Sequence, residues 1–157
     1  MVAEGLVMAQ IRYCLNVYAC DNIRIEATDP KNKMMEELQV IQNKMLRIIL
    51  NKNLKDRVSI SSMLKETKML SVNQIACLST MIDTWKAINL NVEPIKEQLK
   101  FRDSRRFHNL LKGSKDQGSF LTKSAQLWAK SSQRFKTTNL LTIAKTEARM
   151  TVNTVPS

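Results

Sequence analysis

The spacing of apolar positions along this chain predicts a succession of helices. Residues 2–19 are apolar nearly all round, and helical spacing is carried by Leu6, Val7, Ile11, Cys14, Leu15 and Tyr18. A helix that is apolar on every side is buried by its neighbours. We therefore expect other elements to cover this first helix on more than one side.

A second and longer helix is predicted over residues 31–51. Asp29 followed by Pro30 is typical of a helix start, with the aspartate as N-cap and the proline at the first helical position. Apolar residues then recur at alternating spacings of four and three, at Met34, Leu38, Ile41, Met45 and Ile48. This heptad-like stripe would run along a helix roughly 30 Å long. It could pair with the first helix as a hairpin.

Two further helices are predicted before residue 95. The first spans about 60–67 and is carried by Ile60, Met63 and Leu64. Ser71 and Gln74 then match a capping box at the start of a helix over 72–89, which Pro94 follows as a breaker. The apolar positions near one face of this helix are Val72, Ile75, Leu78, Ile82, Trp85 and Ile88.

Residues 96–157 form a basic C-terminal third that we expect to be partly disordered. Residues 100–120, with several arginines and two glycines, predict a mobile basic loop. Two modest helices follow, over about 121–132 and 138–150. The predicted fold class is mainly α, with a helical hairpin plus further helices in region 1–95 and one or two short helices in region 96–157.

The composition agrees with this fold class, and the sequence also indicates where in the cell the protein is found. The chain has 157 residues, 43% of them apolar, only three glycines and three prolines, and 5% aromatic residues, which disfavours a sheet protein with many tight turns. No run of about 18 apolar residues exists that could span a membrane. The start of the chain lacks the basic and long apolar regions of a signal peptide. We therefore expect an intracellular protein, nuclear or cytoplasmic.

Metal and catalytic motifs are absent from the sequence. Cys14, Cys20 and Cys77 form no Cys-x-x-Cys pair, and the single histidine, His108, lies far from them along the chain. A zinc site needs about four ligands at recognisable spacings. We expect no metal, no cofactor, buried thiols and a solvated loop histidine.

Charge is distributed unevenly. Residues 96–149 contain 13 basic and 4 acidic side chains, net +9, whereas residues 1–95 contain 12 basic and 10 acidic, net +2. Aromatic residues interleave the basic region, at Phe101, Phe107, Phe120, Trp128 and Phe135. Such a composition suits phosphate contacts with occasional base stacking, which makes RNA or another nucleic acid the leading partner. The alternative, to which we give equal weight, is that the basic residues merely solvate a loosely packed tail, while Trp85 and Trp128 anchor a core.

The segment Leu38–Leu50 carries a resemblance to a known family. Its Leu38, Ile41, Gln42, Asn43, Lys44, Leu46, Arg47 and Ile48 resemble a helix that follows the polymerase palm in non-LTR retrotransposon reverse transcriptases. Further segments resemble the family in the same order, namely 5–19, 55–59, 70–74, 84–87, 124–128 and 144–156. Cys14 and Ala19 depart from usual glycines, and Leu127-Trp128 is followed by Ala-Lys where the family has Asn and then Pro.

The resemblance implies the thumb and C-terminal tail of an RNA-directed DNA polymerase, without its palm. Polymerases need aspartates that converge on two metal ions, and the six aspartates here are dispersed with no Tyr-x-Asp-Asp string. We therefore expect no catalysis by this chain. By analogy with the family, phosphate contacts are implied for Lys44, Arg47, Lys52, Lys55 and Arg57, with Arg102, Arg105 and Arg106 extending the track.

Three functional interpretations remain open at this point. The first is sequence-tolerant binding of RNA or an RNA–DNA hybrid. The second is a helical protein-interaction module, in which the apolar first helix and the heptad stripe self-associate or dock on a protein partner. The third is a relic of a mobile element without a selected function.

Overall fold

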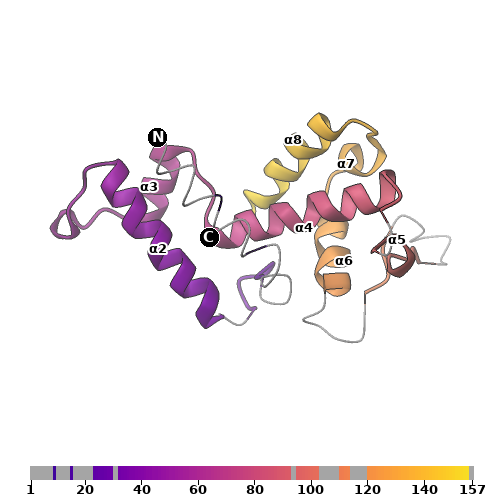
Figure 1. Cartoon of the computed structure of the whole chain (residues 1–157), viewed down its shortest axis with the longest axis horizontal. Coiled ribbons are helices and arrows are strands. Elements are labelled where there is room, and N and C mark those ends of the chain that lie inside the picture. Colours follow the sequence, from indigo (N-terminus) through magenta and orange to yellow (C-terminus); the bar gives the residue numbers. More distant parts are fainter. Residues whose placement is uncertain are drawn as a thin grey trace.

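The computed structural model describes Ala9, Leu15 and residues 23–29, 32–92, 95–102, 110–113 and 120–155. The described part is mainly α-helical, as the sequence predicted. Its elements are α2 (Lys33–Ile49), the 3-10 turn η1 (Leu54–Asp56), α3 (Ile60–Thr67), α4 (Val72–Asn89), α5 (Ile95–Gln98), α6 (Phe120–Lys130), α7 (Gln133–Thr137) and α8 (Leu141–Val152). Figure 1 shows α4 as the central rod, with the α2–α3 hairpin at its N-terminal end and α6 to α8 along the rest.

The central helix α4 begins and ends where the pattern predicted. The Ser71 hydroxyl accepts from the Gln74 amide, and the Gln74 side chain accepts from the Ser71 amide, so the predicted capping box is confirmed. The helix is buried nearly all round, and Thr80 and Thr84 satisfy their hydroxyls on carbonyls one turn back. It can therefore serve as the core against which both halves of the described chain pack.

The start of α2 corrects a prediction. Asn32 is the N-cap, and its side chain accepts from the amides of Met34 and Met35. Asp29 instead accepts from the Ile25 and Glu26 amides and closes a turn within residues 23–29. An aspartate before a proline was the more obvious cap in the sequence, but its carboxylate is already used by the preceding turn.

The buried face of α2 also differs from the predicted stripe. Met35, Gln42 and Leu46 are buried, whereas Ile41 and Ile48, two positions of the predicted stripe, are exposed. The hydrophobic contact with α3 and α4 is thus rotated away from the heptad-like row. A small separate core joins Leu46 with Met63 and Leu64 of α3, so the α2–α3 hairpin is held together by its own cluster.

The C-terminal helices pack tightly on α4. Leu127, Phe135, Ala144, Ala148 and Val152 are fully buried in the main core. Trp85 of α4 donates its indole N–H to the Thr138 carbonyl, 3.1 Å away. The predicted helices over 121–132 and 138–150 correspond to α6 and α8, while α5 and α7 were not predicted. The described part of this region is therefore a packed body and not a loose tail.

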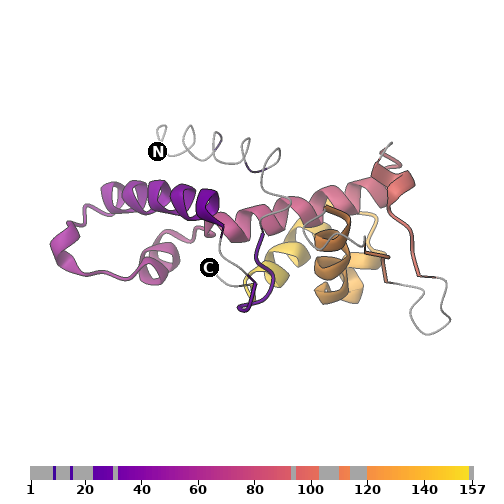
Figure 2. The same ribbon diagram turned by 90° about the horizontal axis from the view of Figure 1, so that it is seen from below.

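Residues 23–29 join the body through side-chain contacts. The Asn73 amide group bonds both the amide and the carbonyl of Arg24, each at 2.8 Å. Lys130 of α6 forms an ion pair with Glu26, and Lys123 forms one with Asp29 at 3.7 Å. This turn therefore contacts both α4 and α6. Figure 2 shows it in indigo beside the N-terminal part of α4.

Most of the predicted mobile loop lies outside the described residues, which omit 103–109 and 114–119. The described ends of residues 100–112 pair with each other. Phe101 and Leu111 form an antiparallel bridge, and the Arg102 amide donates to the Leu110 carbonyl at 2.8 Å. The entry and exit of this segment are thus joined by backbone hydrogen bonds.

The predicted hairpin between residues 2–19 and α2 also lies outside the described residues, apart from Ala9 and Leu15. Both of these are helical, and Leu15 is buried in the main core. Within the part of the chain that the structure describes, no helix combines the length and the apolar character that crossing a bilayer would need.

Candidate nucleic-acid interface

The loop at the tip of the α2–α3 hairpin is built by a chain of polar contacts. Arg47 donates to the Asn53 carbonyl at 3.1 Å, and the Asp56 carboxylate accepts from the Asn53 amide at 2.6 Å. Arg57 follows in the left-handed conformation with φ 48°, and Ser59 then caps α3. This geometry turns the chain through η1 and leaves Lys55 and Arg57 exposed.

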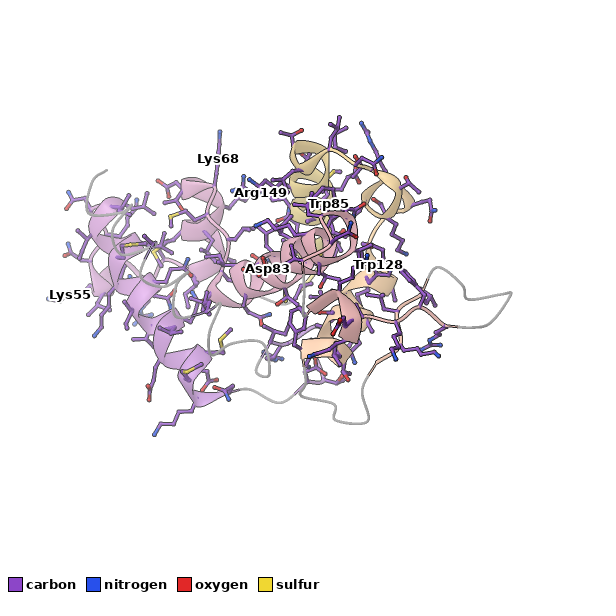
Figure 3. The ribbon with its side chains drawn as sticks, turned by 45° about the vertical axis from the view of Figure 1, so that its right-hand side comes forward. Lys55, Lys68, Asp83, Trp85, Trp128 and Arg149 are labelled. Carbon is purple, nitrogen blue, oxygen red and sulfur yellow. The ribbon has the colours of Figure 1, made fainter. Side chains whose placement is uncertain are left out.

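Five of the predicted phosphate-binding residues lie on or beside this hairpin. Lys44, Lys55 and Arg57 are exposed, while Arg47 and Lys52 are half-buried. Arg47 already uses its guanidinium on the Asn53 carbonyl, so it builds the tip of the hairpin. Lys55 marks that tip in Figure 3.

The remaining predicted residues do not join this group. Arg102 is exposed and follows α5 by four residues, and Figure 1 shows α5 at the end of the molecule opposite the α2–α3 hairpin. Arg105 and Arg106 lie outside the described residues. Of the predicted loop residues, the structure therefore places only Arg102, and it does not bring this residue next to the group on the hairpin.

Sequence reasoning missed two cations of the hairpin. Lys65 and Lys68 of α3 are exposed, and Lys68 occupies the left-handed C-cap position with φ 56°. Lysine is unusual at a position that favours glycine. The sequence did contain one signal for Lys68, because this lysine directly follows the predicted end of the helix over 60–67.

The hairpin cations share one electrostatic property. Among the described residues, none of Lys52, Lys55, Arg57, Lys65 and Lys68 forms a side-chain ion pair or hydrogen bond. Residues 40–70 contain seven basic and two acidic side chains, net +5. These five residues, called the hairpin cations below, thus form an uncompensated positive surface.

The C-terminal helices present a different picture. Lys123 pairs with Asp29, Lys130 with Glu26, and Arg134 with Glu147. Burial lowers the pKa of Lys136. Most basic side chains of α6 and α7 therefore pair with acidic side chains of the protein itself. The net positive charge of this region in the sequence thus overstates how many cations these two helices leave available to bind a polyanion.

Helix α8 contributes a second exposed group of cations. Lys145 and Arg149 line a hollow of about 320 Å³, together with Thr146, Met150 and Asn153. Figure 3 shows Arg149 on the same side of the molecule as Lys68 of α3. Lys145 and Arg149 thus form a second patch of exposed positive charge besides the hairpin cations.

Two of the five predicted aromatic residues, Trp128 and Phe135, are too deeply buried to stack on bases, whereas Phe120 is half-buried. Trp128 and Phe135 are buried and pack edge to face with ring centroids 5.6 Å apart. Phe101 stands edge-on to Trp128 and is the more exposed ring, at 39%. Phe107 lies outside the described residues. The expectation that Trp85 and Trp128 anchor the core is confirmed.

The described residues hold no cluster of side chains that could bind a metal ion. No group of three His, Cys, Asp or Glu side chains converges among them, and His108 is not one of them. Cys77 is buried, and burial raises the pKa of its thiol to about 12. Asp83 lies half-exposed on α4, where burial raises the pKa of its carboxyl and neighbouring Lys86 opposes that shift.

Comparisons with protein-family models, with curated proteins and with solved structures find no match to this chain.

Proposed function

We propose that this protein binds RNA or RNA–DNA hybrids through the phosphate backbone, as a non-catalytic part of a retrotransposon reverse transcriptase. The observation that carries the proposal is the set of hairpin cations, which are solvent-accessible and lack acidic partners among the described residues. Phosphates release condensed counterions when such cations approach them, which drives binding without reading sequence. The order of family-like segments along the chain supports the reverse-transcriptase origin.

The binding surface of this proposal runs over the hairpin and on to α8. Lys52, Lys55 and Arg57 stand at the tip, Lys65 and Lys68 along α3, and Lys145 and Arg149 follow on α8. The contacts in this proposal are mainly electrostatic, because the surface consists of lysines and arginines and the rings of Trp128 and Phe135 are buried. Binding is therefore sequence-tolerant and sensitive to salt.

The chain itself catalyses no reaction in this proposal, and it acts inside the cell where nucleic acid is present. The catalytic aspartates of the parent family would belong to a separate palm. Support comes from the sequence, where six dispersed aspartates replace the paired motif.

Fluorescence anisotropy with labelled single-stranded RNA, over a salt series, tests the proposal. The affected variant combines Lys55→Gln with Lys65→Gln. The matched control combines Lys130→Gln with Arg134→Gln, which removes two charges that are already paired. Each phosphate contact contributes a slope of about −0.7 to log affinity against log salt on single strands. The hairpin variant should reduce the magnitude of the slope by about 1.4, and the control should leave it unchanged.

Circular dichroism first establishes that each variant is folded. A folded wild-type chain that fails to bind RNA at low salt would refute the proposal. Equal effects of the two variants would assign binding to overall charge and not to the hairpin. An RNA–DNA hybrid titrated in parallel reports the preferred nucleic acid.

Arg102, Arg105 and Arg106 require their own variants, since two of them lie outside the described residues. Replacing Arg105 and Arg106 with Ala should weaken binding uniformly across sequences and flatten its salt dependence if they contact phosphates. Unchanged affinity and slope would remove the basic loop from the binding surface.

A further inference from the structure

The solvent face of α2 carries a row of residues that the protein core does not use. Glu37, Ile41, Lys44 and Ile48 follow one another at spacings of four, three and four, which places them in one line along the helix. Ile41 is 49% exposed and Ile48 is 80% exposed. Val40 beside them is 51% exposed. The opposite face of the helix is the one that packs into the molecule.

This row, called the α2 strip below, is more than scattered exposed apolar residues. Apolar and charged positions alternate along it, and the two charges differ in sign. Ile49, the last residue of α2, and Leu54, the first of η1, add further exposed apolar surface, at 41% and 82% exposure. Contiguous apolar surface bordered by charges is typical of protein interfaces.

We propose that the α2 strip is the contact surface for a second copy of this chain, with the two α2 helices antiparallel. A two-fold axis beside Ile41 brings Ile41 against its own copy. The same axis sets Glu37 of one helix beside Lys44 of the other, and the reverse pair forms by symmetry. Ile48 then faces the end of the helix that carries Met34. Ile41 thus meets its own copy, and each charge of the strip meets its opposite.

The charges select this arrangement over the parallel one. In a parallel pair in register, Glu37 would lie beside Glu37 and Lys44 beside Lys44, which places like charges together. Flanking charges of this kind set orientation and partner choice in helix pairs. A protein partner of unrelated sequence would require a complementary pattern that nothing in this chain specifies, whereas a second copy supplies it by symmetry.

The dimer is expected to be weak. One helix against one helix buries less than the ~1,200 Å² typical of stable complexes, so association should depend on protein concentration. It leaves the phosphate surface open, because Lys55, Lys65 and Lys68 do not belong to α2. Lys44 contacts Glu37 of the second copy and is therefore left out of that surface.

Sedimentation velocity from about 10 μM to about 1 mM protein tests the proposal. The wild-type chain should shift from monomer to dimer across this range. Ile48→Glu should weaken the dimer by about tenfold or more, since each dimer buries this side chain twice. Leu140→Glu is the matched control, since Leu140 is also exposed, at 60%, but lies before α8. It should leave association unchanged.

Charge reversal gives a sharper readout. Glu37→Lys alone and Lys44→Glu alone should each abolish self-association, because each places like charges together. A mixture of these two variants should form a heterodimer, and the double variant Glu37→Lys with Lys44→Glu should dimerise as the wild type does.

Two outcomes would overturn the proposal. A wild-type chain that stays monomeric at every concentration leaves the α2 strip bare or assigns it to another occupant, such as a different protein or residues 1–22 of the same chain. A dimer that is insensitive to Ile48→Glu and to charge reversal uses a different surface. RNA titration of an Ile48→Gln variant, which removes the apolar contact without adding a negative charge near the hairpin cations, should match the wild type, so failure of this proposal is distinguishable from failure of nucleic-acid binding.

Discussion

The side-chain amide of Gln42 donates a 2.8 Å hydrogen bond to the backbone carbonyl of Leu70, across the junction between the α2–α3 hairpin and α4. Gln42 is fully buried, and its own oxygen accepts from Gln39 at 2.9 Å. The Gln39 oxygen in turn accepts from the Val72 amide, the first of α4. The amides of α2 therefore satisfy backbone groups at the start of the central helix and fix where the hairpin projects.

Replacing Gln42 with Leu should lower the free energy of unfolding by about 1–3 kcal/mol, because the buried Leu70 carbonyl would lose its partner while the volume stays similar. Urea denaturation followed by circular dichroism measures this. Gln126→Leu on the exposed side of α6 is the control and should change stability by less than about 0.5 kcal/mol. Equal losses in both variants would show that the Gln42 bond contributes nothing specific.

Two hairpin cations occupy left-handed backbone, and this allows charge and stability to be separated. Arg57 has φ 48° and Lys68 has φ 56°. Glycine adopts this region without the strain that a side chain incurs. Arg57→Gly and Lys68→Gly should therefore keep or raise the free energy of unfolding, by up to about 1 kcal/mol each, while RNA binding weakens.

The corresponding Ala variants are the comparison. Arg57→Ala and Lys68→Ala remove the same charges but retain the strain, so they should weaken RNA binding equally without the gain in stability. Thermal unfolding and the salt series together measure both effects. A glycine variant less stable than its alanine counterpart would contradict the left-handed assignment.

Local signals in the sequence predicted local structure well. Ser71 and Gln74 interact with backbone groups three residues apart, so the capping box and the start of α4 could be recognised without any tertiary information. The short apolar pattern over 60–67 was likewise enough to predict α3 with its observed bounds. The prediction of Asp29 as the N-cap was wrong because its carboxylate could complete either of two local motifs. In the structure it accepts from amides of the 23–29 turn and does not cap the helix.

The pattern of apolar residues could not predict which helix face is buried or which distant residues pair. The heptad row at Ile41 and Ile48 was as good a candidate for burial as the face with Met35 and Leu46, since both contain apolar residues at helical spacing. Gln42 looked like part of a polar surface, and it is buried because the Leu70 carbonyl lies across from it. The pairing of Lys130 with Glu26 joins residues about a hundred positions apart, so net charge per segment could not reveal it.

Asp29 should make stability depend on acid. Burial raises the pKa of its carboxyl, but the Ile25 and Glu26 amides and the charge of Lys123 outweigh that effect, so the pKa lies below its ordinary value of 3.8. A carboxyl with a lowered folded-state pKa contributes stability above its unfolded pKa, and the contribution is lost as pH falls through the folded value.

Asp29→Asn should therefore lower the free energy of unfolding by about 1–2 kcal/mol at neutral pH. The loss should begin to shrink as pH falls past the unfolded-state pKa of about 4, and it should vanish only below the lower folded-state pKa, where the wild-type carboxyl is protonated in both states. Urea denaturation at a series of pH values measures the loss of stability at neutral pH and its decrease in acid. Glu66→Gln, on the exposed side of α3, serves as the control and should cause little change at neutral pH. A loss that is constant with pH would show that the charge of Asp29 is irrelevant.

Cys77 should report global unfolding of the body. Its side chain is fully buried on α4, and burial raises the pKa of the thiol to about 12, so almost no thiolate exists near neutral pH. In a Cys14→Ser, Cys20→Ser background, a thiol reagent should fail to label the native protein and should label it fully in urea. The rate of labelling at intermediate urea should follow the unfolding transition seen by circular dichroism. Adding Ser61→Cys, on the exposed side of α3, should give immediate reaction of one thiol. Native labelling of Cys77 at a comparable rate would mean that α4 opens locally without unfolding of the helices packed around it.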